Sequence, residues 1–92
     1  MWLTFSTRPA EYRLFARSVL LYAVNGREGV AFGIDEGALS QLEQRTRRLT
    51  PGQQEKLAER HRARLEAAAA MAFKQGRGRG PRYCIWIGPD DI

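Results

Sequence analysis

The stretch SVLLYAVNGREGVAFGI, residues 18–34, decides the fold of this chain. Two apolar runs, 19–24 and 30–34, flank the pair Asn25-Gly26. Asn-Gly is the strongest short-range signal for a β-hairpin, because both residues tolerate a positive φ angle. The sequence therefore predicts two antiparallel strands joined by a tight turn.

The second arm of this hairpin has two different faces, because alternate residues of a strand point to opposite sides of the sheet. One face carries Val30, Phe32 and Ile34, and the other carries Gly29, Ala31 and Gly33. We expect the larger side chains to enter a core. The small ones should leave a smooth surface that a helix can approach closely.

Two helices are predicted after the hairpin. Asp35 stands at an N-cap position, and a first helix of about four turns is indicated by the helical spacing of Leu39, Leu42, Thr46 and Leu49. The segment Thr50-Pro51-Gly52-Gln53 has the sequence of a capping box, with proline at the first helical position. This second helix should run to about Gln75 and end at Gly76, since glycine readily adopts the left-handed conformation there.

One more strand completes the pattern. Residues 83–87, YCIWI, are apolar and aromatic and predict a buried strand, whereas residues 2–5 indicate a weak edge strand. The order is (β)ββααβ, and the fold class is α+β: a small antiparallel sheet with two helices packed on one face. The chain is short enough for a single domain, 1–92, with a basic Gly/Arg loop at 76–82 and an acidic tail at 88–92.

From the hairpin onward the chain resembles a known family. The resemblance is carried by EGALSQL (36–42), ERHRARLEAAAAMAFKQG (59–76) and PDDI (89–92), with Arg62, Leu65, Ala69 and Phe73 in the family's spacing. The chain is similar here to the small bacterial domain-of-unknown-function family 1488, over roughly residues 19–92, while the segment before Val19 departs from that pattern. The resemblance implies an α+β fold, but no activity and no catalytic or binding residue.

No group of residues in the sequence predicts catalysis, a metal or a cofactor. One cysteine, Cys84, and one histidine, His61, are too few for a structural zinc site, and a lone cysteine excludes an internal disulfide. Cys84 lies in an apolar strand that disfavours a thiolate, which argues against a nucleophile–base pair with His61. We interpret His61, between Leu57 and Leu65, as a histidine at the edge of the core, with a pH-sensing or ligand role as the alternative. The chain is therefore expected to be non-enzymatic.

The net charge of +5 is unevenly placed, because residues 45–82 carry eleven Lys and Arg but only three Glu. On the second helix the cations fall on one flank, and Glu55, Glu59 and Glu66 fall on the other. Arg45, Arg47 and Arg48 are accounted for by the dipole of the first helix. The residues expected to bind a polyanion are Lys56, Arg60, Arg64, Lys74, Arg77, Arg79 and Arg82.

Three interpretations of this basic surface stay open: a solvated face, a site for nucleic acid or another polyanion, and a site for an acidic protein surface. We expect a small binding or regulatory protein that holds nucleic acid or another polyanion through the helix flank and the Gly/Arg loop. The alternative is a protein-interaction module, such as an accessory subunit or an inhibitor of a host or phage complex. No apolar run is long enough for a membrane span, so a cytoplasmic protein is expected. The edges of such a small sheet allow self-association.

Overall fold

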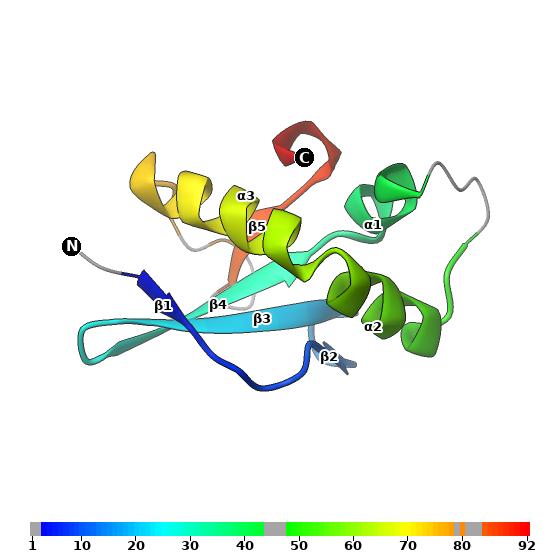
Figure 1. Cartoon of the computed structure of the whole chain (residues 1–92), viewed down its shortest axis with the longest axis horizontal. Helices are drawn as coiled ribbons and strands as arrows, with labels where there is room; N and C mark the ends of the chain where they lie inside the picture. Colours follow the sequence, from blue (N-terminus) through cyan, green and yellow to red (C-terminus); the bar gives the residue numbers. More distant parts are fainter. Residues whose placement is uncertain (1–2, 44–47, 79, 81–83) are drawn as a thin grey trace.

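Figure 1 shows the computed structural model of the chain, which describes residues 3–43, 48–78, 80 and 84–92. The described part contains five strands, three α-helices and a short 3-10 turn. In chain order these are β1 (Leu3–Phe5), β2 (Glu11–Arg13), β3 (Ser18–Asn25), β4 (Glu28–Ile34), α1 (Glu36–Leu42), α2 (Pro51–Arg60), α3 (Arg62–Lys74), β5 (Cys84–Ile87) and the 3-10 turn Pro89–Asp91. The α+β class is therefore confirmed, with β2 and a third helix added to the expected order.

The sheet has the strand order β1-β3-β4-β5, and β2 also pairs with β3. Both β1 and β2 are antiparallel to β3, β1 beside residues 23–25 and β2 beside residues 18–20. Strand β5 is parallel to β4, with Ala31 opposite Cys84 and Ile34 opposite Ile87. The sheet is thus mixed and not purely antiparallel, because the chain crosses over through the helices before it adds β5 beside β4.

The predicted hairpin is confirmed, with its turn one residue further along. Asn25 pairs with Glu28, so that Gly26 and Arg27 form the two-residue turn. Gly26 has a φ of 65°, the positive value that a hairpin turn with glycine at its first central position requires. Asn25 is the last residue of β3 and lies outside the turn.

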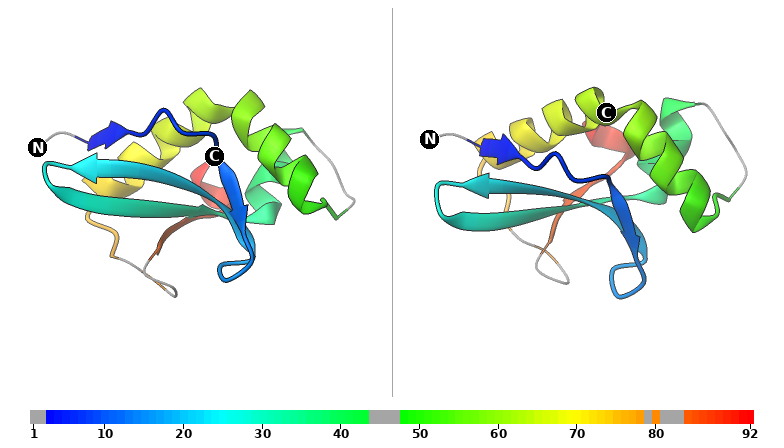
Figure 2. Two further views of the ribbon diagram at one scale, coloured as in Figure 1. Left: turned by 90° about the horizontal axis from the view of Figure 1, so that it is seen from below. Right: turned by 60° about the horizontal axis from the view of Figure 1, so that its bottom comes forward.

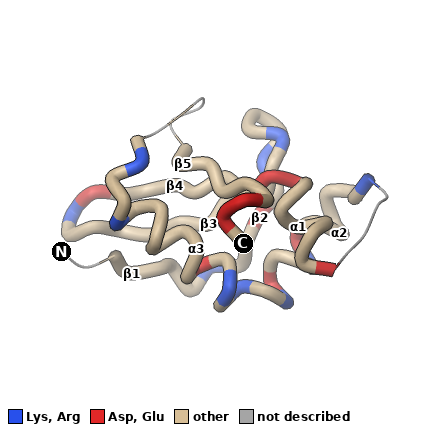
Figure 3. The backbone as a smooth tube through the Cα atoms, turned by 90° about the horizontal axis from the view of Figure 1, so that it is seen from above, with Lys and Arg blue, Asp and Glu red and all other residues tan. Residues whose placement is uncertain are grey.

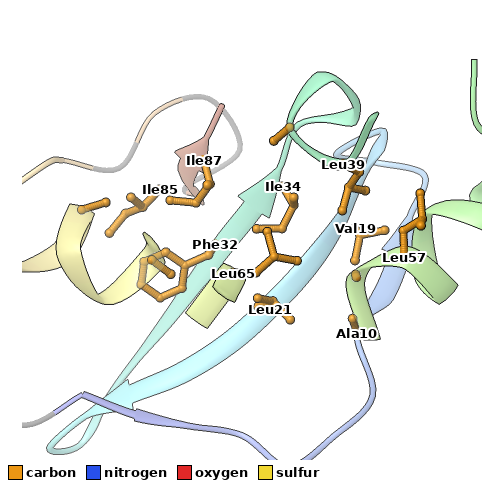
Figure 4. Packing of buried hydrophobic residues seen from close by; sticks show 14 of the residues in the cluster. Ala10, Val19, Leu21, Phe32, Ile34, Leu39, Leu57, Leu65, Ile85 and Ile87 are labelled. Atoms are coloured by element: carbon orange, nitrogen blue, oxygen red, sulfur yellow. The ribbon is translucent and has the colours of Figure 1, made fainter. Parts of the chain in front are cut away.

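The helices form one layer on one face of the sheet, as the views in Figures 1 and 2 agree. Apolar side chains of β3 and β4, including Leu21 and Phe32, point toward this layer and meet Leu65 of α3 (Figure 4). Leu65 and Phe32 are completely buried. The core therefore fills the space between the sheet and the helices, as the alternation along β4 predicts.

The first helix is shorter than predicted. Helix α1 ends at Leu42, with Glu43 as its C-cap, so it makes two turns. Leu49 is buried as expected, but it lies outside any helix, and its N–H donates to Oε2 of Glu36 at 2.7 Å. Thr46 lies outside the described residues. The helical spacing of the leucines does not distinguish one long helix from a short helix followed by a non-helical segment, because both arrangements can bury Leu39 and Leu49.

The predicted second helix is two helices that meet at His61. The capping box of Thr50 and Gln53 is confirmed, and Gly76 has a φ of 76° at the C-terminal end. His61 has non-helical angles of −108° and 24°, although its backbone still bonds Leu57 and Leu65 at 3.0 Å on either side. The bend lets α2 pack on β2 and β3 while α3 packs on β5.

The opposite face of the sheet carries a smaller apolar cluster of Ala16, Leu20 and Cys84, with Tyr22, Ala31 and Trp86 beside it. No helix of the described part packs on this cluster. The smooth face around Gly33 is covered by the indole of Trp86. The expected approach of a helix to these small residues is therefore wrong, because β5 supplies an aromatic side chain instead.

Candidate polyanion-binding surface

The outer flank of α2 and α3 carries the four helical cations that the sequence singles out, Lys56, Arg60, Arg64 and Lys74, named here the cation row. All four are exposed. Lys56 and Arg60 on α2 and Arg64 on α3 recur every four residues. The backbone hydrogen bonds of His61 to Leu57 and Leu65 continue the helical repeat across the bend, so the three cations share one side. Lys74 follows Arg64 by ten residues, which is about 15 Å along a helix axis. It borders a hollow of about 730 Å³ whose lining includes Leu3, Ala70 and Phe73.

Arg60 forms the one ion pair of this row within the described residues. Its Nη1 atom lies 2.7 Å from Oε2 of Glu43, and Nε2 of His61 lies 3.1 Å from the same oxygen. The hydrogen bond from Arg60, followed by that from His61, lowers the pKa of Glu43. The Arg60 side chain remains 61% exposed, so it pairs with Glu43 while still facing solvent. His61 is a partly buried residue at the core edge, in line with its interpretation from the sequence.

The acidic residues of α2 and α3 are held in internal contacts on the other flank. Glu55 accepts a hydrogen bond from the N–H of Tyr12 at 2.8 Å, and Glu59 accepts one from the N–H of Ala10 at 2.5 Å. These carboxylates hold the segment before and within β2 against α2. They therefore serve the fold and do not neutralise the cation row.

Arg62 organises the rest of that flank. Its guanidinium donates to Glu59 at 2.8 Å, to Glu66 at 2.9 Å and to the carbonyl oxygen of Ser6 at 2.6 Å. The hydrogen bond to Glu66 is the main cause of a raised pKa for Arg62. This arginine is consequently a link between α3 and the N-terminal segment.

Arg77 was expected in the polyanion site, but the structure gives it internal partners. It donates to both carboxylate oxygens of Asp91, at 2.5 and 3.1 Å, and to the carbonyl oxygen of Trp86. The hydrogen bond between Arg77 and Asp91 raises the pKa of Arg77 and lowers the pKa of Asp91. Arg77 thus ties the end of α3 to β5 and to the C-terminal turn, and it leaves the set of candidate binding residues.

Three cations of the row have no such partner. Lys56, Arg64 and Lys74 make no ion pair or side-chain hydrogen bond within the part of the chain that is described. The other predicted members, Arg79 and Arg82, lie outside the described residues, as do Arg45 and Arg47. Figure 3 shows the basic residues at several separate places along the trace with acidic residues between them. Among the described residues, the predicted patch is therefore reduced to the cation row, while Arg79 and Arg82 stay predictions.

The other chemistry considered from the sequence is not assembled. Cys84 is buried on the face of the sheet opposite the helices, whereas His61 joins α2 and α3, so the two do not form a nucleophile–base pair. Among the described residues, no three His, Cys, Asp or Glu side chains are grouped to hold a metal ion. None of the described helices is long and apolar enough to cross a bilayer.

Two features of the structure are not predicted from the sequence. One is strand β2, because three residues carry little periodic signal, although Glu11-Tyr12-Arg13 alternates in polarity. The other is the exposed pair Leu14 and Phe15, because exposure depends on tertiary packing and not on local sequence.

The sequence pattern of one family, described as protein of unknown function (DUF1488), matches residues 3–87. The match begins earlier than the resemblance over residues 19–92 suggested, so the N-terminal strands lie within it. A crystal structure of a protein of unknown function from this family, from Shewanella loihica PV-4, is similar with a TM-score of 0.76. The two are 16% identical, over 92% of this chain and 90% of that one, which shows a shared fold. No curated protein matches the chain.

Proposed function

The chain belongs to the DUF1488 family of proteins of unknown function, and on that premise we propose that it is a small binding protein whose cation row holds a polyanion, nucleic acid in the first instance. One observation carries the proposal. The acids of α2 and α3 are turned to internal contacts, whereas Lys56, Arg64 and Lys74 face solvent without partners. The exposed charge of this surface is therefore more positive than the residue composition of α2 and α3 alone would indicate.

The physical basis is the release of counterions. Each Lys or Arg that neutralises a phosphate releases a condensed ion, so affinity falls steeply with salt. A row of four cations predicts a slope of about −3.6 for log K against log salt on duplex DNA. Point charges on long side chains contact phosphates without reading bases, so we expect binding that depends little on sequence. Arg60 would join by exchanging part of its contact with Glu43 for a phosphate.

The proposal also places the protein in the cytoplasm, where nucleic acid is accessible. A single cysteine, buried in β5, suits a reducing compartment. No catalytic step is part of this function, and no cofactor is needed for it.

The test is fluorescence anisotropy with a labelled DNA duplex and a labelled RNA across potassium chloride from about 50 to 200 mM. The variant Lys56→Ala/Arg64→Ala/Lys74→Ala should bind weakly, with a slope reduced to about −0.9 because Arg60 alone remains. A matched control, Arg8→Ala/Arg17→Ala/Arg27→Ala, removes three exposed cations from the connections between strands β1 to β4 and should keep most of the slope.

Two results would overturn the proposal. One is the lack of any anisotropy change at the lowest salt. The other is an equal loss of affinity in both triple variants, which would mean that net charge alone drives the association. An acidic protein surface, the alternative partner, would then be the next candidate for the same row.

A further inference from the structure

Strand β5 is the outer strand on one side of the sheet, since the strand order among the described residues is β1-β3-β4-β5. The carbonyl of Ile87 accepts a hydrogen bond at 3.0 Å from the N–H of Asp35, which directly follows β4. Successive residues of a strand direct their backbone groups to opposite sides, so Ile85 and Ile87 face β4. The backbone groups of Cys84 and Trp86 therefore face outward, and we call them the β5 edge.

The composition of β5 favours the addition of another strand. The segment Cys84–Ile87 has the sequence CIWI, without a charge or a proline. Apolar strands of β-branched and aromatic residues pair readily with a second chain wherever their edge is accessible. The other side of the sheet ends in β1 and β2, which have three residues each, and β2 includes Glu11 and Arg13. Very short or charged outer strands pair poorly, so β5 is the strand that needs protection.

Both carbonyls of the β5 edge accept hydrogen bonds from donors of the same chain. The N–H of Gly80 donates to the carbonyl of Cys84 at 2.7 Å, and the guanidinium of Arg77 donates to the carbonyl of Trp86. Arg77 is held in this position by Asp91, to which it donates at 2.5 and 3.1 Å. The arginine precedes β5 in the chain and the carboxylate follows it, so this contact forms only when β5 is in place.

We propose that Arg77 protects the β5 edge, and that its contact with the Trp86 carbonyl prevents β5 from pairing with β5 of a second copy. An incoming strand needs this carbonyl as an acceptor, and a hydrogen bond from a charged donor is stronger than one from a neutral amide. The incoming strand would also have to separate Arg77 from Asp91. Without Arg77, two β5 strands can meet antiparallel about a two-fold axis, where the same residues serve both partners.

This role is separate from polyanion binding. Arg77 is not part of the cation row, because its guanidinium is engaged by Asp91 and Trp86. The polyanion test uses variants of Lys56, Arg64 and Lys74 together, whereas the edge is tested by the loss of Arg77 alone. Either proposal can therefore fail while the other holds.

Sedimentation velocity over a range of protein concentrations tests the protection. We expect Arg77→Ala to self-associate at least about tenfold more tightly than the wild type, the gain expected from one or two new backbone hydrogen bonds between chains. Lys74→Ala is the matched control for charge, since it removes one exposed cation from the same end of α3. It should associate no more tightly than the wild type.

A second control separates edge pairing from a general loss of stability. Glu55→Ala/Glu59→Ala removes the acceptors of two backbone N–H groups on the other flank of the helices and leaves the β5 edge covered. This variant should also associate no more tightly than the wild type. Equal association of this variant and Arg77→Ala would mean that destabilisation alone exposes an adhesive surface, and would overturn the proposal.

Hydrogen exchange locates the contact in the associated protein. Between dilute and concentrated Arg77→Ala, exchange should slow at the amides of Cys84 and Trp86, which face outward. Slower exchange only at amides outside β5 would place the contact elsewhere and contradict the assignment. An Arg77→Ala variant that associates no more than the wild type would contradict it as well.

Discussion

The indole of Trp86 on β5 lies directly against Gly33 on the neighbouring strand β4. A Cβ atom at residue 33 would come within 2.9 Å of Cη2 of Trp86 and closer still to Cζ3 and Cε3. Real Cβ atoms do not make such contacts, and the obstacle is the rigid part of an aromatic side chain. The glycine is therefore required by packing, since no positive φ is recorded for it.

Gly33→Ala should consequently destabilise the protein by about 1–3 kcal/mol, the usual cost of overpacking. Gly29→Ala is the control on the same strand and the same face, where an added Cβ meets nothing within 4 Å. That change should be neutral or slightly stabilising, because alanine loses less backbone entropy on folding. Urea unfolding gives both free energies, and equal effects would contradict the packing role of Trp86.

Arg77 and Lys74 should separate stability from binding. Arg77→Ala removes hydrogen bonds to Asp91 and to the Trp86 carbonyl, and we expect a loss of about 1 kcal/mol of unfolding free energy, since the arginine is partly exposed. Lys74→Ala should stay within about 0.5 kcal/mol, as for surface residues without partners. Anisotropy should rank them in the opposite order, with the larger loss of DNA affinity for Lys74→Ala. The same ranking in both assays would argue against the assignment of their roles.

The stability of the protein should fall in acid. The pKa of Asp91 is lowered from its ordinary value of 3.8, and that of Glu43 from 4.5, so the unfolded chain binds more protons than the folded one in this range. Both contributions are present above those ordinary values and are lost as pH falls through the lowered ones. Asp91→Asn should flatten the dependence of unfolding free energy on pH below about 4. An unchanged dependence in that variant would mean that Asp91 does not carry the effect.

The carboxylates of Glu55 and Glu59 on α2 should hold the N-terminal segment against the helix. In Glu55→Ala/Glu59→Ala the N–H groups of Ala10 and Tyr12 lose their acceptors. Their hydrogen exchange should accelerate by roughly tenfold or more, since a bond to a charged acceptor contributes about 1.5–3 kcal/mol. Lys56→Ala, between the two on α2, should leave exchange at both amides unchanged. Equal exchange in all three proteins would contradict the anchoring role.

Part of the fold was predictable because it follows from short-range patterns. The hairpin around Gly26 and the capping box of Thr50 and Gln53 depend on residues only a few positions apart. Gly76 likewise ends α3 through its own left-handed angle. The length of α1 was less predictable. Leu49 lies outside the helix but is still buried, and its N–H group is held by the carboxylate of Glu36.

The candidate site was predictable only in its helical half. Spacing alone places Lys56, Arg60 and Arg64 on one flank of the helices. The spacing gives no information on which cations form ion pairs. Arg77 pairs with Asp91 because β5 lies parallel to β4, and Asp91 follows β5 in the chain.

The sequence by itself determined the hairpin, the capping box that starts α2, the glycine that ends α3 and the α+β class, since these depend on backbone preferences and on the periods of strand and helix. Only the tertiary structure decided that β5 runs parallel to β4, and that Glu59 holds a backbone group 49 residues away. It also decided which charges remain exposed. The physical reason is that an ion pair or a hydrogen bond depends on distance in space, which local sequence patterns do not contain.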